Sequence, residues 1–93
     1  MGYKTRVHIF VKGRVQGVFF RDRTCKKAKK LELTGWVKNL KNGMVEAVFE
    51  GEKDMIGKII KWIKKGPTIS RVDNVELEEQ KYQCEFETFE IKY

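Results

Sequence analysis

One glycine-containing stretch, between an alternating apolar run and a lysine-rich run, constrains this chain more than any other feature. Residues 13–21 read GRVQGVFFR, with two glycines four residues apart and an arginine at the end. Apolar and polar side chains alternate before it, which predicts a strand over residues 5–12. Apolar side chains recur at spacings of three and four after it, which predicts a helix over residues 19–31. The stretch is therefore a predicted strand-to-helix turn.

A turn of this kind can bind phosphate. Glycines allow several backbone N–H groups to point at one position, where the N-terminus of the following helix adds the positive end of its dipole. Arg21 contributes a planar guanidinium that is permanently charged and suits a phosphate group. We therefore expect a phosphate site at this turn.

The charge of the chain favours an anionic partner. Its 93 residues include 20 Lys and Arg against 13 Asp and Glu, which gives a net charge of +7. Nucleic acid and small phosphorylated or carboxylated molecules both fit this charge, and a merely solvated lysine-rich surface remains an alternative. The length is enough for one core, so we expect a single domain over residues 1–93.

The sequence also favours a reducing compartment. Cys25 and Cys84 form no CxxC pair, and we expect both to be free thiols. The N-terminus lacks the apolar region of a secretory signal, and no apolar run approaches the ~20 residues that span a bilayer. We therefore expect a soluble cytoplasmic protein, monomeric and without a membrane partner.

The remaining elements follow from periodicity and turn residues. Asn42-Gly43 separates two extended runs, which is typical of a hairpin whose turn residues both tolerate positive φ. Gly51 is expected to break the chain before an amphipathic helix, and Gly66-Pro67 to end that helix. The predicted elements are strands at 34–41 and 44–50, a helix at 53–65, a strand within residues 69–79 around Val75 and Leu77, and a final strand within residues 84–92.

This order predicts an α+β protein with the ferredoxin-like βαββαβ arrangement. Two helices would cover one face of a largely antiparallel sheet, a short extra strand would follow at the C-terminus, and the other face would be solvated. On that face we expect His8 to be a solvated strand residue, because nothing nearby in the sequence would orient its ring. Trp36 is expected to pack in the core or on a face of the sheet, in preference to stacking on a nucleic-acid base.

Several kinds of site are not indicated. The glycines of the turn are followed by neither the Lys nor the Ser/Thr of a nucleotide-hydrolysing P-loop. One histidine and no cysteine pair make a zinc site improbable, and no acidic cluster beside the turn suggests a magnesium site. If the chain is an enzyme, we expect it to act without a metal and without a covalent intermediate.

An RNA-binding module of the same fold is an alternative. Residues 9–13 resemble the short first-strand motif of RNA-recognition domains. Residues 44–50, however, carry acidic side chains where the aromatic and basic residues of the decisive motif are wanted. We therefore do not expect nucleic acid to be the partner.

Two separated segments resemble the acylphosphatase family. Residues 13–21 are similar to its first signature, and residues 35–45, which read GWVKNLKNGMV and are followed by Gly51, are similar to its second. The closing Phe89-x-Ile91 also resembles the end of that family. Dense motifs in this order cover essentially the whole chain and are more specific than either motif alone.

The resemblance implies an enzyme that hydrolyses the carboxyl-phosphate anhydride of acyl phosphates to a carboxylate and inorganic phosphate, without a cofactor. It implies Arg21 and Asn39 as the catalytic pair. It also implies phosphate binding by the loop, mainly through backbone N–H groups. The implied phosphate-binding residues are Val15, Gln16, Gly17, Val18, Phe19, Phe20 and Arg21.

The chemistry of these residue types agrees with the implied roles. An uncharged amide such as Asn39 can position a water beside an anionic phosphate, where a carboxylate would be repelled. A carboxylate leaving group needs little protonation, so stabilising the phosphoryl oxygens is the main requirement. We expect Gln16 to hold the loop instead of contacting substrate, and Phe19 and Phe20 to pack beneath it.

Three matters stay open at the level of sequence. Glu32-Leu33 stands where the family commonly has Gly-Leu, so either the helix ends differently or about 1–2 kcal/mol of backbone strain is tolerated. A non-catalytic domain that binds carbamoyl phosphate is a further alternative, because acylphosphatase-like domains also form parts of larger carbamoyl-transfer enzymes. The physiological acyl phosphate is not readable from the residues.

Overall fold

Five strands form one sheet in the order β4-β1-β3-β2-β5, and two helices pack on it. The computed structural model describes residues 3–67 and 69–93. Neighbouring strands are antiparallel except β2 and β5, which are parallel. The elements are β1 (Lys4–Arg14), α1 (Phe20–Lys30), β2 (Thr34–Asn39), β3 (Val45–Glu52), α2 (Lys53–Lys65), β4 (Arg71–Gln80) and β5 (Phe89–Lys92).

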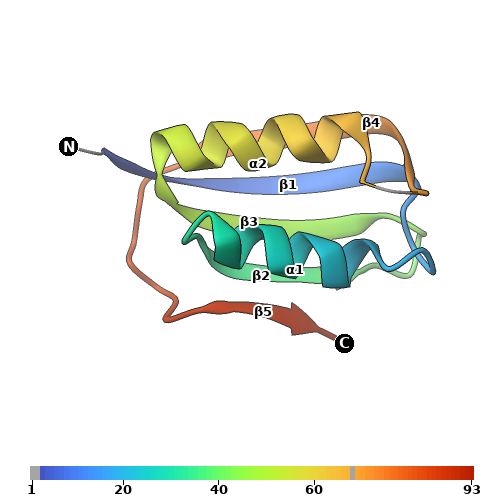
Figure 1. Cartoon of the computed structure of the whole chain (residues 1–93), viewed down its shortest axis with the longest axis horizontal. Helices are drawn as coiled ribbons and strands as arrows, with labels where there is room; N and C mark the ends of the chain where they lie inside the picture. Colours follow the sequence, from blue (N-terminus) through green and yellow to red (C-terminus); the bar gives the residue numbers. More distant parts are fainter. Residues whose placement is uncertain (1–2, 68) are drawn as a thin grey trace.

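Both helices lie on the same face of the sheet, as Figure 1 shows. The fold is the ferredoxin-like α+β arrangement with an added C-terminal strand, so the predicted fold class is confirmed. Neither helix within residues 3–67 and 69–93 is long and apolar enough to span a membrane.

The core lies between the sheet and the helices. The alternation predicted for the first strand is observed, with Val7, Ile9 and Val11 buried toward the helices. Phe49 of β3 stacks on Phe89 of β5 with ring centroids 5.1 Å apart, which ties the added strand to the core. The helix α2 contributes the isoleucines of its predicted apolar stripe, of which Ile56, Ile59 and Ile63 are buried.

The strand β1 is longer than predicted and contains Gly13. The pairing of β1 with β4 shifts register between Lys12 and Gly13, and a Cβ at Gly13 would lie 2.1 Å from the carbonyl oxygen of Arg71. This glycine therefore permits a close approach of two strands at a bulge. The prediction that both glycines belong to the turn was wrong, because only Gly17 lies in it.

Other predicted boundaries were also wrong. Gly51 does not break the chain, since β3 continues through it to Glu52 and α2 begins at the next residue. A Cβ on Gly51 would lie 2.6 Å from Leu33 Cδ2, so the glycine makes room for a packed side chain. The last strand, Phe89–Lys92, does lie within residues 84–92, where a strand was predicted.

The hairpin turn between β2 and β3 also differs from the prediction. Asn42 and Gly43 both tolerate positive φ, but among the described residues of the turn only Gly43 adopts it, at 90°. The Asn42 side chain instead accepts a hydrogen bond from the backbone N–H of Met44 at 3.0 Å. The turn therefore spans more residues than a two-residue hairpin, and β2 ends at Asn39.

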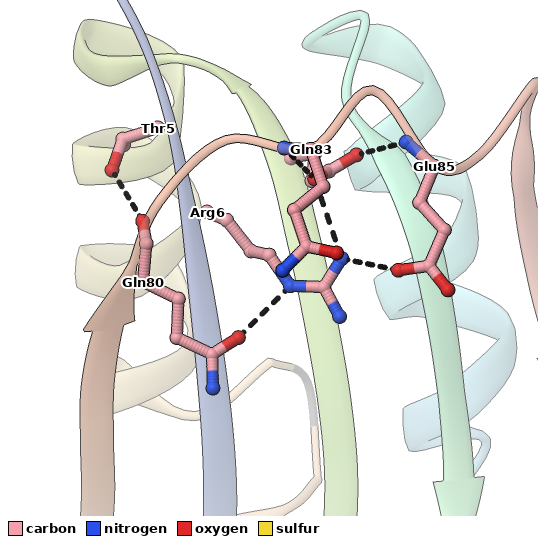
Figure 2. Close-up of polar contacts among 6 residues, drawn as sticks. Thr5, Arg6, Gln80, Gln83 and Glu85 are labelled. Carbon is pink, nitrogen blue, oxygen red and sulfur yellow. Dashed lines mark hydrogen bonds and ion pairs between the residues drawn. The ribbon is translucent and has the colours of Figure 1, made fainter.

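The connection between β4 and β5 is held by a buried carboxylate, Glu50. Its oxygens accept hydrogen bonds from the backbone N–H groups of Gln83 and Glu85 at 2.8 and 3.0 Å, and lie 3.3 Å from Arg6 Nη1. Figure 2 shows Arg6 between this connection and Gln80. In the same connection a hydrogen bond with Cys84 raises the pKa of Tyr82. The contacts of Glu50 fix this connection, which leads the chain to β5 beside β2.

The structure shows how α1 ends before Glu32, a position where glycine is common. Its backbone adopts φ 59°, and its N–H donates to the carbonyl of Lys29 at 3.0 Å. The N–H of Leu33 donates to the carbonyl of Ala28 at 2.9 Å. This is a Schellman ending whose left-handed position holds glutamate, so the helix ends in the usual way and the strain is tolerated.

Replacing this residue by glycine should stabilise the protein. We predict that Glu32→Gly raises the free energy of unfolding by about 1 kcal/mol, because glycine adopts the left-handed conformation without the Cβ penalty. Guanidinium denaturation measures the change. Lys29→Gly, an exposed position inside α1, is the matched control and should lower stability by about 1 kcal/mol. Equal effects of the two changes would contradict the strain at Glu32.

Candidate active site

Three segments far apart in the sequence meet at one end of the molecule. They are the turn from β1 to α1, the hairpin from β2 to β3, and the C-terminal end of β5 (Figure 1). A cavity of about 310 Å³ opens between them. Its lining residues are Val15, Gly17, Phe19, Phe20, Arg21, Asp22, Asn39, Ile91 and Tyr93.

The backbone of the turn is free to donate hydrogen bonds. Residues 16–19 form a bend, with Gly17 at φ 73° and Phe19 at φ 62°. Their four backbone N–H groups donate to no acceptor among the described residues. Backbone N–H groups without a protein acceptor at the N-terminus of a helix are suited to an anionic ligand, so this turn at the start of α1 can bind one.

Gln16 fastens the turn to the hairpin. Its Nε2 donates hydrogen bonds to the carbonyl oxygens of Leu40 and Met44, at 2.7 and 2.8 Å. These two carbonyls flank the hairpin turn that follows Asn39. The expectation that the Gln16 side chain holds the loop is therefore confirmed, whereas binding of phosphate by its backbone N–H remains a prediction.

The two phenylalanines of the turn behave differently. Phe20 is buried, as predicted, and anchors the first turn of α1 in the core. Phe19 does not pack beneath the loop, because its side chain is 73% exposed at the cavity. Val18 is buried and does not line the cavity. A positive φ at Phe19 turns its side chain away from the core, which the sequence did not indicate.

Arg21 lies in the first turn of α1 and at the edge of the cavity. Its Nη1 donates to the carbonyl oxygen of Lys92 at 3.2 Å, and its guanidinium lies 4.8 Å from the centroid of the Tyr93 ring. No carboxylate among the described residues pairs with it. The guanidinium is therefore held by the end of β5 with its charge available to an anion.

Asn39 is the last residue of β2 and faces the same cavity. Its Oδ1 is buried and has no hydrogen-bond partner among the described residues. A buried amide oxygen without a partner is costly, and such an atom in a cavity is suited to a donor supplied by a ligand or a water. The structure thus brings Arg21 and Asn39 to one cavity.

Three lining residues were missed from the sequence, and one of them, Asp22, directly follows Arg21 in α1. Ile91 and Tyr93 enter the cavity from the last strand and the residue after it. The alternation of Phe89, Ile91 and Tyr93 predicted a strand but not its position in the sheet. This strand, β5, reaches the site because it pairs in parallel with β2. Long-range pairing of this kind has no local sequence signal.

His8 was expected to lack an orienting partner, and this was wrong. Its Nε2 lies 2.6 Å from Glu46 Oε2, and its ring packs 4.9 Å from that of Phe10. Both partners lie on the open face of the sheet, away from the cavity. No group of three or more His, Cys, Asp or Glu side chains in the described part of the chain could hold a metal ion.

A known family matches this chain over nearly its whole length. The acylphosphatase family model matches residues 7–91, which include the turn, the hairpin and the final strand. The chain belongs to the acylphosphatase family. The resemblance of the two motifs is therefore confirmed.

Individual acylphosphatases agree with this assignment. An acylphosphatase from Syntrophus aciditrophicus is 48% identical over 95% of this chain and 92% of its own length. The solved structure of a Coxiella burnetii acylphosphatase is 45% identical, covers 96% of this chain and 93% of its own, and superposes with a TM-score of 0.90. That of a Bacillus subtilis acylphosphatase is 35% identical, covers 96% and 99%, and has a TM-score of 0.91. These likenesses support an acylphosphatase enzyme acting on small acyl phosphates.

The link made by Gln16 can be tested without touching the cavity lining. Gln16→Met keeps the side-chain length but removes both hydrogen bonds. We predict a loss of about 1–3 kcal/mol in unfolding free energy, because two carbonyls lose their donor. Amide hydrogen exchange of the turn and of residues 40–44 should increase together. Gln80→Met, on the open face of the sheet, is the control and should leave exchange in the turn unchanged. Unchanged exchange in Gln16→Met would contradict the link.

Proposed function

We propose that this acylphosphatase hydrolyses acyl phosphates by direct attack of a water on the phosphoryl group. The observation that carries the proposal is the convergence of three kinds of free group on one cavity. These are the turn N–H groups, the Arg21 guanidinium and the Asn39 amide oxygen. Two of them are suited to phosphoryl oxygens and the third to a water.

The turn and Arg21 would bind the phosphoryl group. Backbone N–H groups of residues 15–20 and the positive end of α1 would surround its oxygens, and Arg21 would add a full positive charge. The transition state of phosphoryl transfer is loose, with charge spread over the equatorial oxygens. Donors fixed in advance around those oxygens stabilise this charge without reorganising during the reaction.

Asn39 would position the water. Its Oδ1 can accept a hydrogen bond from the water and thereby direct the oxygen lone pair toward phosphorus. The new P–O bond forms as the bond from phosphorus to the acyl oxygen breaks, and the electron pair leaves with the carboxylate. A proton of the water passes to a phosphate oxygen. The products are a carboxylate and inorganic phosphate, and no covalent intermediate forms.

The site supports an enzyme that acts as one chain. The turn, Arg21 and Asn39 all come from the same chain, so we propose a monomer whose residues 1–93 form one acylphosphatase-like domain. Cys25 is buried and Cys84 is exposed, and both are free thiols, which agrees with a reducing compartment such as the cytoplasm.

The open face of the sheet argues against the RNA-binding alternative. Phe10, the aromatic residue of the motif-like segment in β1, pairs with Glu46 on one side and Glu76 on the other. Carboxylates flanking the aromatic side chain would repel a nucleic-acid backbone. A domain that only binds carbamoyl phosphate is distinguished from the proposed enzyme by turnover.

We predict that the purified protein hydrolyses benzoyl phosphate in the presence of a chelator. Arg21→Ala should lower kcat/KM by about 10²–10³ and abolish inhibition by phosphate, since a donor to the phosphoryl oxygens is removed. Asn39→Ala should lower kcat strongly and keep inhibition by phosphate, because the water and not the phosphoryl group loses its partner. Spectrophotometric turnover and phosphate inhibition constants measure both effects.

Matched controls exist for both residues. Arg23→Ala removes an exposed arginine two residues further along α1, and Asn74→Ala removes an exposed asparagine on β4; both should retain wild-type kinetics. No turnover by the wild-type protein would refute the proposed hydrolysis. A near-wild-type rate for Asn39→Ala would refute the positioning of water by this residue.

A further inference from the structure

Phe19 combines two features that seldom occur together. Its backbone is left-handed, with φ 62° and ψ 22°, and its side chain is 73% exposed. A positive φ costs a bulky residue roughly 1–2 kcal/mol relative to ordinary backbone geometry. An exposed aromatic ring gains little from burial, so packing within the chain does not offset this strain.

The structure offers no other account of this residue within its own fold. Phe19 is the residue that precedes α1, but its side chain makes no capping hydrogen bond. Glycine would adopt the same backbone without strain. Strain that is retained without a structural gain clusters at functional sites. The ring itself is therefore the feature to explain.

The ring stands at the cavity that holds the proposed reaction. Phe19 lines it together with Ile91 and Tyr93, whereas Arg21, Asn39 and Asp22 provide its polar side chains. The Asp22 carboxylate pairs with Lys26 at 3.3 Å. Tyr93 is 98% exposed, so it too lies at the mouth of the cavity. The cavity therefore has polar groups for an anion and an apolar rim contributed by two separate segments.

An acyl phosphate has the same division of character. Its phosphoryl group is charged, and its acyl group is often apolar. If the turn binds the phosphoryl group, the acyl group has to extend toward the mouth of the cavity, where the rim lies. An aromatic acyl group would stack on the exposed ring of Phe19 and bury apolar area there, whereas an acetyl or carbamoyl group would reach it little.

We propose that Phe19, with Ile91 and Tyr93, forms a subsite for the acyl group that selects aromatic or bulky apolar acyl phosphates. This inference rests on the proposed function and assigns its substrate class. The conformation of Phe19 presents the ring to the leaving group, and the strain is retained because of that contact.

The ratio of kcat/KM for benzoyl phosphate to that for acetyl phosphate tests the subsite. Phe19→Ala should lower this ratio about five- to tenfold, the discrimination expected from one lost aromatic contact. Phe19→Gly should lower it equally and raise the melting temperature, because the left-handed backbone is relieved; this variant excludes misfolding as the cause. Phe19→Leu should give an intermediate ratio. Ile69→Ala, which removes a 62% exposed apolar side chain outside the cavity, should not change the ratio.

The outcomes distinguish the proposed subsite from the proposed hydrolysis on which it rests. An unchanged ratio in both Phe19→Ala and Phe19→Gly would overturn the subsite while leaving hydrolysis intact. An equal loss of activity toward both substrates would also overturn it, since the side chain would then act through the loop. Failure of the wild-type protein to hydrolyse either substrate would instead refute the proposed function.

Discussion

The two hydrogen bonds of Gln16 join the halves of the candidate site. One side-chain amide donates to the carbonyls of Leu40 and Met44, so the turn before α1 and the hairpin after β2 are held as a unit. Without this link the turn could bind an anion, but nothing would fix its distance from Asn39. A positioned water requires such a fixed distance, since catalysis by orientation is lost with small displacements. The proposed hydrolysis therefore depends on a contact that touches neither substrate nor water.

The same end of the molecule concentrates unsatisfied and strained groups. Four turn N–H groups and the Asn39 oxygen lack partners among the described residues, and Phe19 has a left-handed backbone. The buried Asn39 oxygen and the left-handed backbone of Phe19 cost stability in the free protein, and contacts with a bound ligand would offset this cost. The strain at Glu32 differs, because it satisfies the end of a helix at a distance from the cavity. The strained backbone of Phe19 lies at the cavity and is attributed to function, whereas that of Glu32 lies away from it and is attributed to the helix end.

Sequence patterns predicted the element order, the fold class and the two motifs, because alternation, helical spacing and turn residues act locally. They also pointed to Gln16 as the residue that holds the loop. They could not predict the roles of Gly13 and Gly51. These glycines allow Arg71 and Leu33, from distant segments, to approach the backbone closely. The contribution of β5 to the cavity could not be predicted either, because it also depends on contacts between distant segments. These are the parallel pairing with β2 and the connection held by Glu50. The conformation of Phe19 had no signal in residue type, since a bulky residue seldom adopts positive φ.

The central claim is that the turn binds the phosphoryl group and that water attacks phosphorus. Hydrolysis of benzoyl phosphate by the wild-type protein in ¹⁸O-labelled water, followed by ³¹P NMR and mass spectrometry of the benzoate, tests it most directly. The proposed mechanism predicts that one labelled oxygen appears in inorganic phosphate and none in benzoate. Label in benzoate would mean attack at the carbonyl carbon, and the assignment of the turn, Arg21 and Asn39 to the phosphoryl group would then be wrong.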